Sequence, residues 1–409
     1  MRKVLLKQIV FIVVSILIMS QSCSGASKRD PGKLDAIIHK MDTTYDAEIA
    51  VTVPGAVVLF IKDGEVYYHR AFGYSNLENK VRMAPDAVFQ VASISKSVSA
   101  IGVMKLVEDG YINLDDPVEE YLSRWHIPDS AYNAQGVTFR RLLSHTAGIS
   151  DTIMTAGYPP EIGLPPIEQE LMGNVGSIYE EHYSFPVTLE AAPGQKWKYS
   201  NGGYGILDLA VEEIRKLSFS EYMRFYIMEP MNMLNSSYRY YSDLDEKLAS
   251  SYLHVVIEAS RAILSNEAAV GLYSTAGDLA GLLIEMMKCY HGEPNDFVLN
   301  RDTLLLMLEP QADIESNMYE SMGLGFFIHG EGNKPKVYGH SGSVRGWRAH
   351  YEFCPDTKDG VIILANGIKG DGIIIKRVLI DWRDYLGFDM KNAGFVFPLM
   401  DSTSFSLPD

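Results

Sequence analysis

The fold is decided by the stretch FQVASISKSVSAIGVMKLVEDG, residues 89–110. Its apolar residues recur at three- and four-residue spacing from Ile94 to Val107, which predicts a helix. The pair Asp109-Gly110 ends this helix, because glycine readily takes the left-handed conformation that closes a helix. The spacing therefore places Ser93 and Lys96 on one face of the first helical turn.

These two residue types suggest a nucleophile and its base. A serine hydroxyl needs a base, and a lysine one turn away can serve if burial lowers its pKa. The helix N-terminus adds unpaired N–H groups, which suit a developing oxyanion. Ser93–Lys96 is the only Ser-x-x-Lys pair in the sequence. Taken alone, the pair also fits a helix-capping serine followed by a solvated lysine.

Strand patterns occur before this helix and again near the C-terminal end of the chain. Residues 56–61 and 65–71 are predicted strands joined by the tight turn Asp63-Gly64. Helical periodicity dominates from 139 to 310, and an amphipathic helix is predicted at 374–386. Short runs rich in Val, Ile, Phe and Tyr indicate four more strands, at 322–329, 336–340, 348–353 and 360–366. This order predicts an α/β (α+β) fold: an antiparallel sheet built from both chain ends and flanked by helices, with an inserted, mainly helical domain.

The patterns also predict how the chain is divided. Residues 51–116 and 316–390 form the predicted α/β domain, and residues 117–315 form the predicted helical domain. Within the latter, residues 151–194 are rich in Pro and Gly and lack a clear period, which is typical of a functional lid loop. The remaining segments are a signal peptide at 1–22, a tether and first helix at 23–50, and a C-terminal tail at 391–409 with no assigned role.

The N-terminal segment indicates export. A basic start precedes an apolar run from Ile9 to Met19, which is too short to span a bilayer and fits a secretory signal peptide. Cys23 follows and resembles the lipidated cysteine of bacterial lipoproteins, although simple cleavage nearby is the alternative. We therefore expect the protein in the bacterial cell envelope, in the periplasm or on the outer surface, with membrane contact only through a lipid on Cys23.

Composition narrows the partners. The formal net charge of −16 disfavours binding to nucleic acid or a nonspecific grip on anionic lipid. Apart from Cys23, the chain has only Cys289 and Cys354, so no disulfide scaffold is indicated and both are expected to be buried free thiols. The expected partner is a small-molecule or peptide substrate, and the sequence does not indicate an oligomeric state.

Four segments together resemble one family. Residues 89–96, 142–149, 193–204 and 338–343 are similar, in order and spacing, to the motifs of serine β-lactamase and penicillin-binding-protein-like hydrolases, in the class C-like branch. The second segment reads LLSHTAGI, the third contains Tyr199-Ser200-Asn201, and the fourth contains His340-Ser341-Gly342. The resemblance spans roughly residues 50–390 and implies a β-lactamase/transpeptidase-like fold.

The resemblance also implies a mechanism, which is acyl transfer through a covalent acyl-enzyme. Ser93 would attack a carbonyl, while Lys96 and Tyr199 would form a coupled proton-transfer pair in which the general base is not assigned. Asn201 would orient the substrate and the lysine. The backbone N–H groups of Ser93 and Ser343 would hold the oxyanion. No cofactor and no metal is implied.

The third family motif departs from the Lys-Thr-Gly of many relatives, because this chain has His340, Ser341 and Gly342 at those positions. These residues, with Ser343 and Arg345, are the predicted substrate-binding residues. A histidine is expected to carry only a fractional charge near neutral pH. That weakens the inference to substrates with a free carboxylate unless Arg345 or Arg348, just downstream, supplies a carboxylate clamp. Peptides, esters and β-lactams all remain candidate substrates.

Two of three alternative protein classes lack their defining motif in this sequence. An α/β-hydrolase should show Gly-x-Ser-x-Gly, and the string from Gly339 to Ser343 fails at its last position. A zinc hydrolase lacks support, because no two histidines in the sequence are closer than ten residues. A cell-wall-binding or β-lactam-sensing receptor without turnover would keep the same serine and lysine, so this alternative stays open.

Overall fold

The computed structural model describes residues 29–390, except 152–156, 162, 174–184, 242–243, 255, 260, 317, 331–334, 371–373 and 389. The predicted signal peptide 1–22, Cys23 and the tail 391–409 lie outside the described residues, as do parts of the predicted lid loop. In the part of the chain that is described, no helix combines the length and the apolar character needed to cross a membrane.

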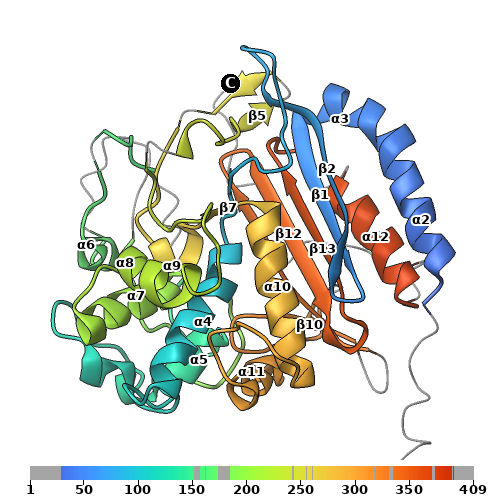
Figure 1. Cartoon of the computed structure of the whole chain (residues 1–409). Coiled ribbons are helices and arrows are strands. Elements are labelled where there is room, and N and C mark those ends of the chain that lie inside the picture. Colours follow the sequence, from blue (N-terminus) through green and yellow to red (C-terminus); the bar gives the residue numbers. More distant parts are fainter. Residues whose placement is uncertain are drawn as a thin grey trace, which may run out of the picture.

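A nine-stranded sheet forms the centre of the molecule (Figure 1). Its strand order is β3-β2-β1-β13-β12-β11-β10-β9-β8, and all neighbouring strands are antiparallel. The strands of this sheet are β1 Gly55–Lys62, β2 Glu65–Asn76, β3 Val81–Arg82, β8 Ala312–Asp313, β9 Ser321–Met322, β10 Phe327–His329, β11 Val337–Val344, β12 Trp347–Cys354 and β13 Asp359–Ala365. Two small ribbons pair β4 Phe89–Gln90 with β7 Tyr273–Ser274, and β5 Tyr252–His254 with β6 Ile257–Glu258.

The sheet joins the two ends of the chain, as the sequence predicts. The turn Asp63-Gly64 has positive φ at both residues, 54° and 83°, which closes the hairpin of β1 and β2. On its other edge β1 pairs with β13, in a register that sets Ala56 opposite Ala365. The mixed α/β fold with a sheet built from both chain ends is therefore confirmed.

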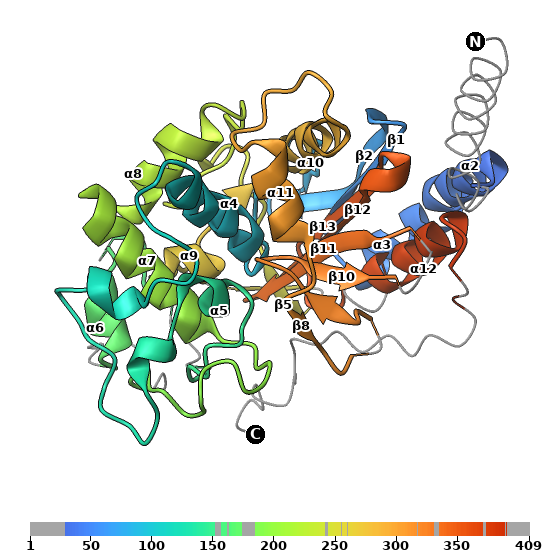
Figure 2. The same ribbon diagram turned by 90° about the horizontal axis from the view of Figure 1, so that it is seen from below.

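Helices cover both faces of the sheet, and the helical part lies beyond one of them (Figures 1 and 2). The α-helices are α2 Pro31–Lys40, α3 Asp46–Thr52, α4 Ile94–Glu108, α5 Phe139–Leu143, α6 Ile167–Leu171, α7 Asn201–Arg215, α8 Phe219–Met223, α9 Glu267–Val270, α10 Ala276–His291, α11 Arg301–Leu308 and α12 Lys376–Tyr385. Two π-helical segments are η1 Met41–Tyr45 and η4 Arg224–Met228, and three 3₁₀ helices are η2 Val118–Tyr121, η3 Ala134–Gly136 and η6 Pro355–Thr357.

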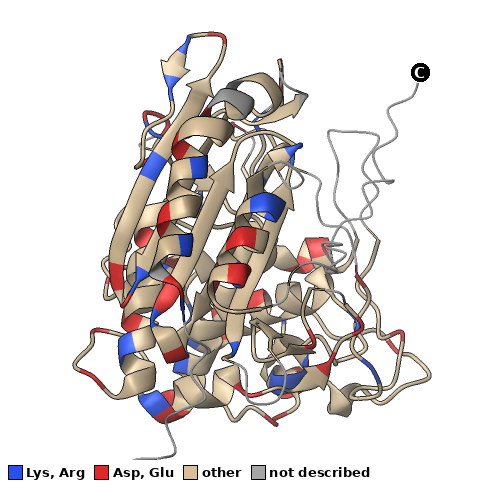
Figure 3. Ribbon diagram, turned by 90° about the vertical axis from the view of Figure 1, so that its right-hand side faces the viewer, with Lys and Arg blue, Asp and Glu red and all other residues tan. Residues whose placement is uncertain are grey.

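The two faces of the sheet contribute to two separate apolar clusters. Val57, Leu59 and Leu364 point toward α4 and α10, whereas Val58 and Ile363 point toward α2, α3 and α12. This alternation follows from the two-residue period of a strand. Acidic and basic residues are interspersed along the helices on the second face (Figure 3).

Several predicted boundaries differ from the structure. The strand predicted at 322–329 is two short strands, β9 and β10, and the strand predicted at 65–71 continues to Asn76. Helix α10, which the prediction assigned to the helical domain 117–315, contacts β1 and β13 and so covers the sheet; the rest of that division stays a prediction. Strand β11 was expected to end at His340 but continues to Val344. The cause is the turn Arg345-Gly346, whose φ values of 36° and 98° allow a tight hairpin that pairs the weak strand formers Ser341 to Ser343 with β12. Cys289 and Cys354 are buried free thiols, as predicted.

A buried ion pair ties α12 to the sheet. The Nε atom of Arg383 donates to Oε2 of Glu352 at 2.9 Å, a second guanidinium nitrogen contacts Oε1, and a third donates to the carbonyl of Met318 at 3.0 Å. Burial alone would raise the pKa of Glu352, but the charge of Arg383 and its hydrogen bonds hold that pKa below its ordinary value. Neither side chain is more than 1% exposed.

We expect the Arg383→Met variant to lose about 3–5 kcal/mol of unfolding free energy, because Glu352 would remain charged and buried without the guanidinium, keeping the Tyr319 hydroxyl and Nε2 of His350 as its polar neighbours. Urea unfolding followed by circular dichroism measures this loss. The control is Lys33→Met, which removes an exposed ion pair with Asp384 of the same helix and should cost at most about 1 kcal/mol. Equal losses in the two variants would contradict the assignment of Arg383 as the stabilising contact.

Candidate active site

Helix α4 carries the predicted nucleophile into the interior. Residues on all faces of this helix are buried, and its first turn lies between α9 and β11. Ser93 occupies the N-cap position, yet its side chain makes no capping hydrogen bond. Its hydroxyl is therefore not used to cap the N-terminus of the helix. The preceding residue, Ala92, has a φ of 49°, a conformation that is uncommon for residues other than glycine. The simple reading of Ser93 as a helix cap is therefore wrong.

Lys96 is completely buried and faces Ser93. Its Nζ atom lies 3.2 Å from Oγ of Ser93, 2.7 Å from Oδ1 of Asn201 and 2.9 Å from the carbonyl oxygen of Ala269. Burial lowers the pKa of Lys96 to about 7, although the nearby charge of Asp151 opposes this shift. A substantial fraction of the amine is therefore uncharged at neutral pH.

The three contacts of Lys96 determine where its lone pair points when the amine is neutral. The carbonyl of Ala269 can only accept a hydrogen bond, and so can Oδ1 of Asn201. A neutral amine has two N–H groups, which these two acceptors occupy. Its lone pair then faces Ser93, the one partner that has a proton to donate. The arrangement fits proton transfer from the serine hydroxyl to the lysine.

Tyr199 lies beside this pair, on the loop that precedes α7. The ring centroid of Tyr199 is 4.9 Å from Nζ of Lys96. Burial raises the pKa of Tyr199 well above its ordinary value, while the Ser93 hydroxyl acts in the opposite direction. The phenol therefore keeps its proton at neutral pH. Asn201 is the first residue of α7, and Ser200 caps the helix by accepting from the N–H of Gly203.

His145 supports this loop from below. Its Nδ1 accepts from the backbone N–H of Ser200 at 3.2 Å, and its carbonyl accepts from the N–H of Lys198 at 2.8 Å. Its ring lies 4.3 Å from that of Tyr199, measured between centroids. Because Nδ1 is an acceptor, the ring proton resides on Nε2. Burial lowers the pKa of His145, so the ring is neutral. These contacts fit a structural role for His145.

Strand β11 brings the third motif against the first turn of α4. A Cβ atom added to Gly342 would lie 2.0 Å from the carbonyl oxygen of Val91 and 3.1 Å from the backbone nitrogen of Ser93. Only glycine fits in that space. Since Val344 and Trp347 close a two-residue hairpin, alternation turns the N–H of Ser343 away from β12. On that side β10 pairs only with residues 337–339.

Two backbone N–H groups are consequently available as hydrogen-bond donors beside the Ser93 hydroxyl. The N–H of Ser93 has no acceptor among the described residues, and the N–H of Ser343 points toward the same edge of the sheet. Two such donors beside a nucleophilic serine suit the oxyanion of a tetrahedral intermediate.

His340 differs from the expectation in its charge. It is fully buried, its ring centroid lies 4.9 Å from that of Phe327, and its Nδ1 lies 2.7 Å from the carbonyl of Ser341. Burial lowers the pKa of His340 to about 3, with a smaller contribution from Lys96. The predicted fractional charge near neutral pH is therefore wrong, because the ring is neutral throughout the neutral range. Arg345 occupies the hairpin turn after Ser343, at φ 36°.

We expect Gly342→Ala to lower kcat by about 100- to 1,000-fold, because the methyl group would push β11 away from Ser93 and separate the two N–H donors. Hydrolysis of a p-nitrophenyl ester measures the change. Gly281→Ala in α10 is the matched control: its added Cβ meets nothing within 4 Å, so kcat should be unchanged. An unaltered kcat in Gly342→Ala would show that this close approach has no part in the reaction.

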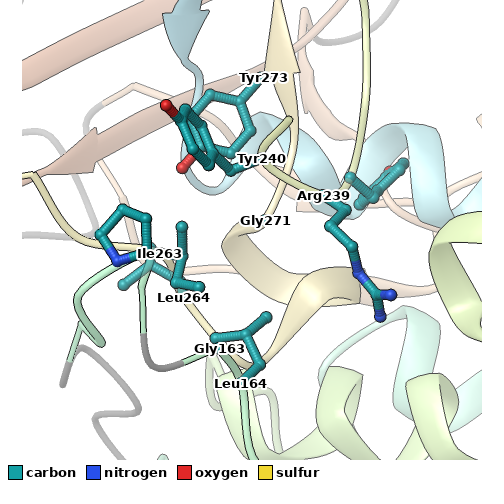
Figure 4. A pocket seen from close by; sticks show the side chains of 10 residues that line it. Gly163, Leu164, Arg239, Tyr240, Ile263, Leu264, Gly271 and Tyr273 are labelled. Atoms are coloured by element: carbon teal, nitrogen blue, oxygen red, sulfur yellow. The ribbon is translucent and has the colours of Figure 1, made fainter. Parts of the chain in front are cut away.

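The described part of the predicted lid loop is more ordered than its sequence indicates. It contains the short helix α6, and Tyr158 pairs with Ile263 and donates to Oε1 of Glu170 at 2.6 Å. A cavity of about 260 Å³ lies between this segment and residues 238–240 and 263–273 (Figure 4). Ser93, Lys96 and Tyr199 do not line it.

The part that three residues play in the site was not predicted from the sequence. The carbonyl of Ala269 and the ring of Phe327 carry no motif, because a backbone oxygen or a packed ring can come from any residue of that type. Asp151 was placed at the start of the lid loop, yet its Oδ1 accepts from both the backbone N–H and Nδ2 of Asn201, each at 3.0 Å. Only an alignment of related sequences or a structure would have revealed these contacts.

This chain is similar to known proteins of one family. A family model described as Beta-lactamase matches residues 38–377. Penicillin-binding protein 4* of Bacillus subtilis is 31% identical over 180 residues, which are 43% of this chain and 36% of that protein. Protein flp of Staphylococcus aureus is 27% identical over 191 residues, which are 46% of this chain and 35% of that protein. The chain thus aligns with only about a third of the length of these curated relatives.

Solved structures extend the likeness to most of the fold. The octameric penicillin-binding protein homologue from Pyrococcus abyssi is 26% identical, with a TM-score of 0.67 over 87% of this chain and 79% of that chain. The penicillin-binding protein from Bacillus halodurans is 22% identical, with a TM-score of 0.64 over 82% of this chain and 97% of that chain, and it supports the fold alone.

Proposed function

Because the chain belongs to the Beta-lactamase family, we propose that it is a serine hydrolase that cleaves an amide or ester through a covalent acyl-enzyme. The observation that carries this proposal is the set of contacts around Lys96. They leave the lone pair of a neutral amine facing the Ser93 hydroxyl. The pKa of about 7 for Lys96 supplies that neutral amine at neutral pH.

The proposed reaction has two halves. Oγ of Ser93 adds to the carbonyl carbon as its proton passes to Nζ of Lys96, and the N–H groups of Ser93 and Ser343 hold the oxyanion. The bond to the leaving group then breaks, and the leaving group takes up the proton. A water molecule adds to the acyl carbon and releases the acid, which regenerates Ser93.

The raised pKa of Tyr199 assigns the two members of the proton-transfer pair different roles. A phenol that keeps its proton at neutral pH can donate but is a poor base, whereas Lys96 is available as a base. In this proposal Lys96 removes the proton of Ser93, Tyr199 passes its own proton to the leaving group, and the Lys96 ammonium returns a proton to Tyr199. Asn201 holds Lys96 and orients the substrate, which His340, Ser341, Gly342 and Ser343 bind along the edge of β11.

A substrate panel tests the proposal. The purified protein is incubated with a p-nitrophenyl ester, a chromogenic cephalosporin and D-amino-acid peptides, and released product is measured alongside the acylated fraction by mass spectrometry. A hydrolase releases more product than one equivalent of enzyme and returns to the free form. A protein that stays acylated with one equivalent of product would instead be a receptor, and the turnover part of the proposal would fail.

We also propose that the protein is exported to the bacterial cell envelope and anchored through Cys23, on the basis of the apolar run at 9–19 and the cysteine that follows it. Fractionation of cells that express the wild type and Cys23→Ala tests this. The wild type is expected with membranes and the variant in the soluble periplasmic fraction. Finding both in the cytosol would refute export, and finding both soluble in the periplasm would refute only the lipid anchor.

A further inference from the structure

One carboxylate outside the proposed catalytic pair reaches it through a single side chain. Oδ1 of Asp151 accepts two hydrogen bonds from Asn201, from the backbone N–H and from Nδ2, both at 3.0 Å. Oδ1 of Asn201 in turn lies 2.7 Å from Nζ of Lys96. Asp151, Asn201 and Lys96 therefore form a continuous chain that ends at the Ser93 hydroxyl.

These contacts fix the orientation of the Asn201 amide. A carboxylate can only accept hydrogen bonds, so it must face the NH₂ end of the amide. The oxygen end is thereby directed at Lys96. If the amide were reversed, its NH₂ group would face the amine and would compete for the lone pair that Ser93 needs. A side chain without an acceptor at position 151 would not exclude that reversal.

Asp151 differs in charge from the titratable side chains that surround Lys96. The titratable groups that face Lys96 are His145 from the segment after α5, Tyr199 before α7, Tyr204 in α7 and His340 in β11. Burial lowers the pKa of both histidines and raises the pKa of both tyrosines, so all four are neutral near pH 7. Asp151 is the charged group that acts on Lys96, and it raises the pKa of Lys96 against the effect of burial.

We propose that Asp151 is a positioning residue that orients Asn201 toward Lys96 and sets the pH at which the Ser93–Lys96 pair becomes active. This inference rests on the proposed function. Asp151 is exposed and lies outside the buried part of the site, so its role is separable from the packing of the fold.

Two substitutions separate the two effects. Asp151→Ala removes both the acceptor and the charge, and we expect kcat on a p-nitrophenyl ester to fall about 10- to 100-fold because the Asn201 amide can then reorient. Asp151→Asn removes the charge but retains a carbonyl oxygen as acceptor, so kcat on its high-pH plateau should stay within about threefold of the wild type. Its low-pH limb of kcat/KM should shift to lower pH, because loss of the negative charge lowers the pKa of Lys96.

The control is Glu161→Gln, which removes an exposed carboxylate from the same chain segment and should leave kcat and the pH profile unchanged. A second readout is the rate at which a fluorophosphonate probe labels Ser93, measured from pH 5 to pH 9, because it does not depend on deacylation. The same shift to lower pH is expected in this rate for Asp151→Asn.

A pH profile of Asp151→Asn that matches the wild type would overturn the role of the charge. A wild-type kcat in Asp151→Ala would overturn the positioning of Asn201. Both results are distinguishable from failure of the proposed function, in which the wild type would stay acylated without turnover or Ser93→Ala would itself retain hydrolysis.

Discussion

Replacing Ser93 with alanine is expected to remove turnover by on the order of 10⁴-fold or more, because no other described group is placed to form the acyl-enzyme. Labelling by a fluorophosphonate or a β-lactam probe should disappear as well. The fold should survive, since the Ser93 side chain makes no capping bond and its hydroxyl contacts Lys96, a residue of the proposed catalytic pair. The unfolding free energy is expected to change by about 1 kcal/mol or less.

The matched control for this variant is Ser97→Ala. Ser97 is also buried on α4, one turn further along, and it is not a hydrogen-bond partner of Lys96. Turnover and probe labelling should persist in Ser97→Ala. If Ser93→Ala hydrolysed the substrate at the wild-type rate, the assignment of the nucleophile would be wrong, and α4 would be a purely structural helix.

Replacing Lys96 with methionine is expected to cost nearly as much activity as the loss of Ser93, because residues that act as one unit lose function together. Lys96→Arg should be equally inactive, since arginine keeps its proton at every accessible pH. In the wild type, kcat/KM should fall tenfold per unit below about pH 7, where Lys96 becomes charged. High activity in Lys96→Arg would exclude Lys96 as the base.

The Lys96→Met variant also tests how the stability of the fold depends on pH. In the unfolded chain the pKa of Lys96 is near 10.5, and in the folded protein it is about 7, so between these values the unfolded state binds more protons. Stability of the wild type should therefore rise with pH relative to Lys96→Met, by on the order of 3 kcal/mol between pH 7 and pH 9.5. Urea unfolding across this range measures the difference. A constant difference between the two proteins would mean that the lysine has an ordinary pKa in the fold.

Local patterns were sufficient to predict much of this structure. The strands at both ends of the chain carry alternating or continuous runs of β-branched residues, and Asp63-Gly64 specifies a turn, so the sheet could be predicted. Helix α4 followed from its apolar spacing. The position of α10 could not be predicted, because an amphipathic helix shows that one face is covered but not which element covers it.

For the candidate site, the residue types could be predicted from the sequence, but their environment could not. The motifs pointed to Ser93, Lys96, Tyr199 and Asn201, and the structure places them together around Nζ of Lys96. The neutral state of His340 depends on burial by residues such as Phe327, far away in the chain, and no local pattern reports that. The same is true of Asp151, whose contact with Asn201 bridges 50 residues.

The pairing of β1 with β13 has a consequence for how this chain folds. Strand β1 ends at Lys62, whereas its partner begins at Asp359, so the middle of the sheet cannot assemble until almost the whole chain has been synthesised. Contacts of such long sequence separation slow folding, because a large loop must close before the contact is made. During that delay one edge of the β1–β2 hairpin is unpaired and open to association with other chains. Refolding from denaturant is therefore expected to be slow, and its yield should fall as the protein concentration rises.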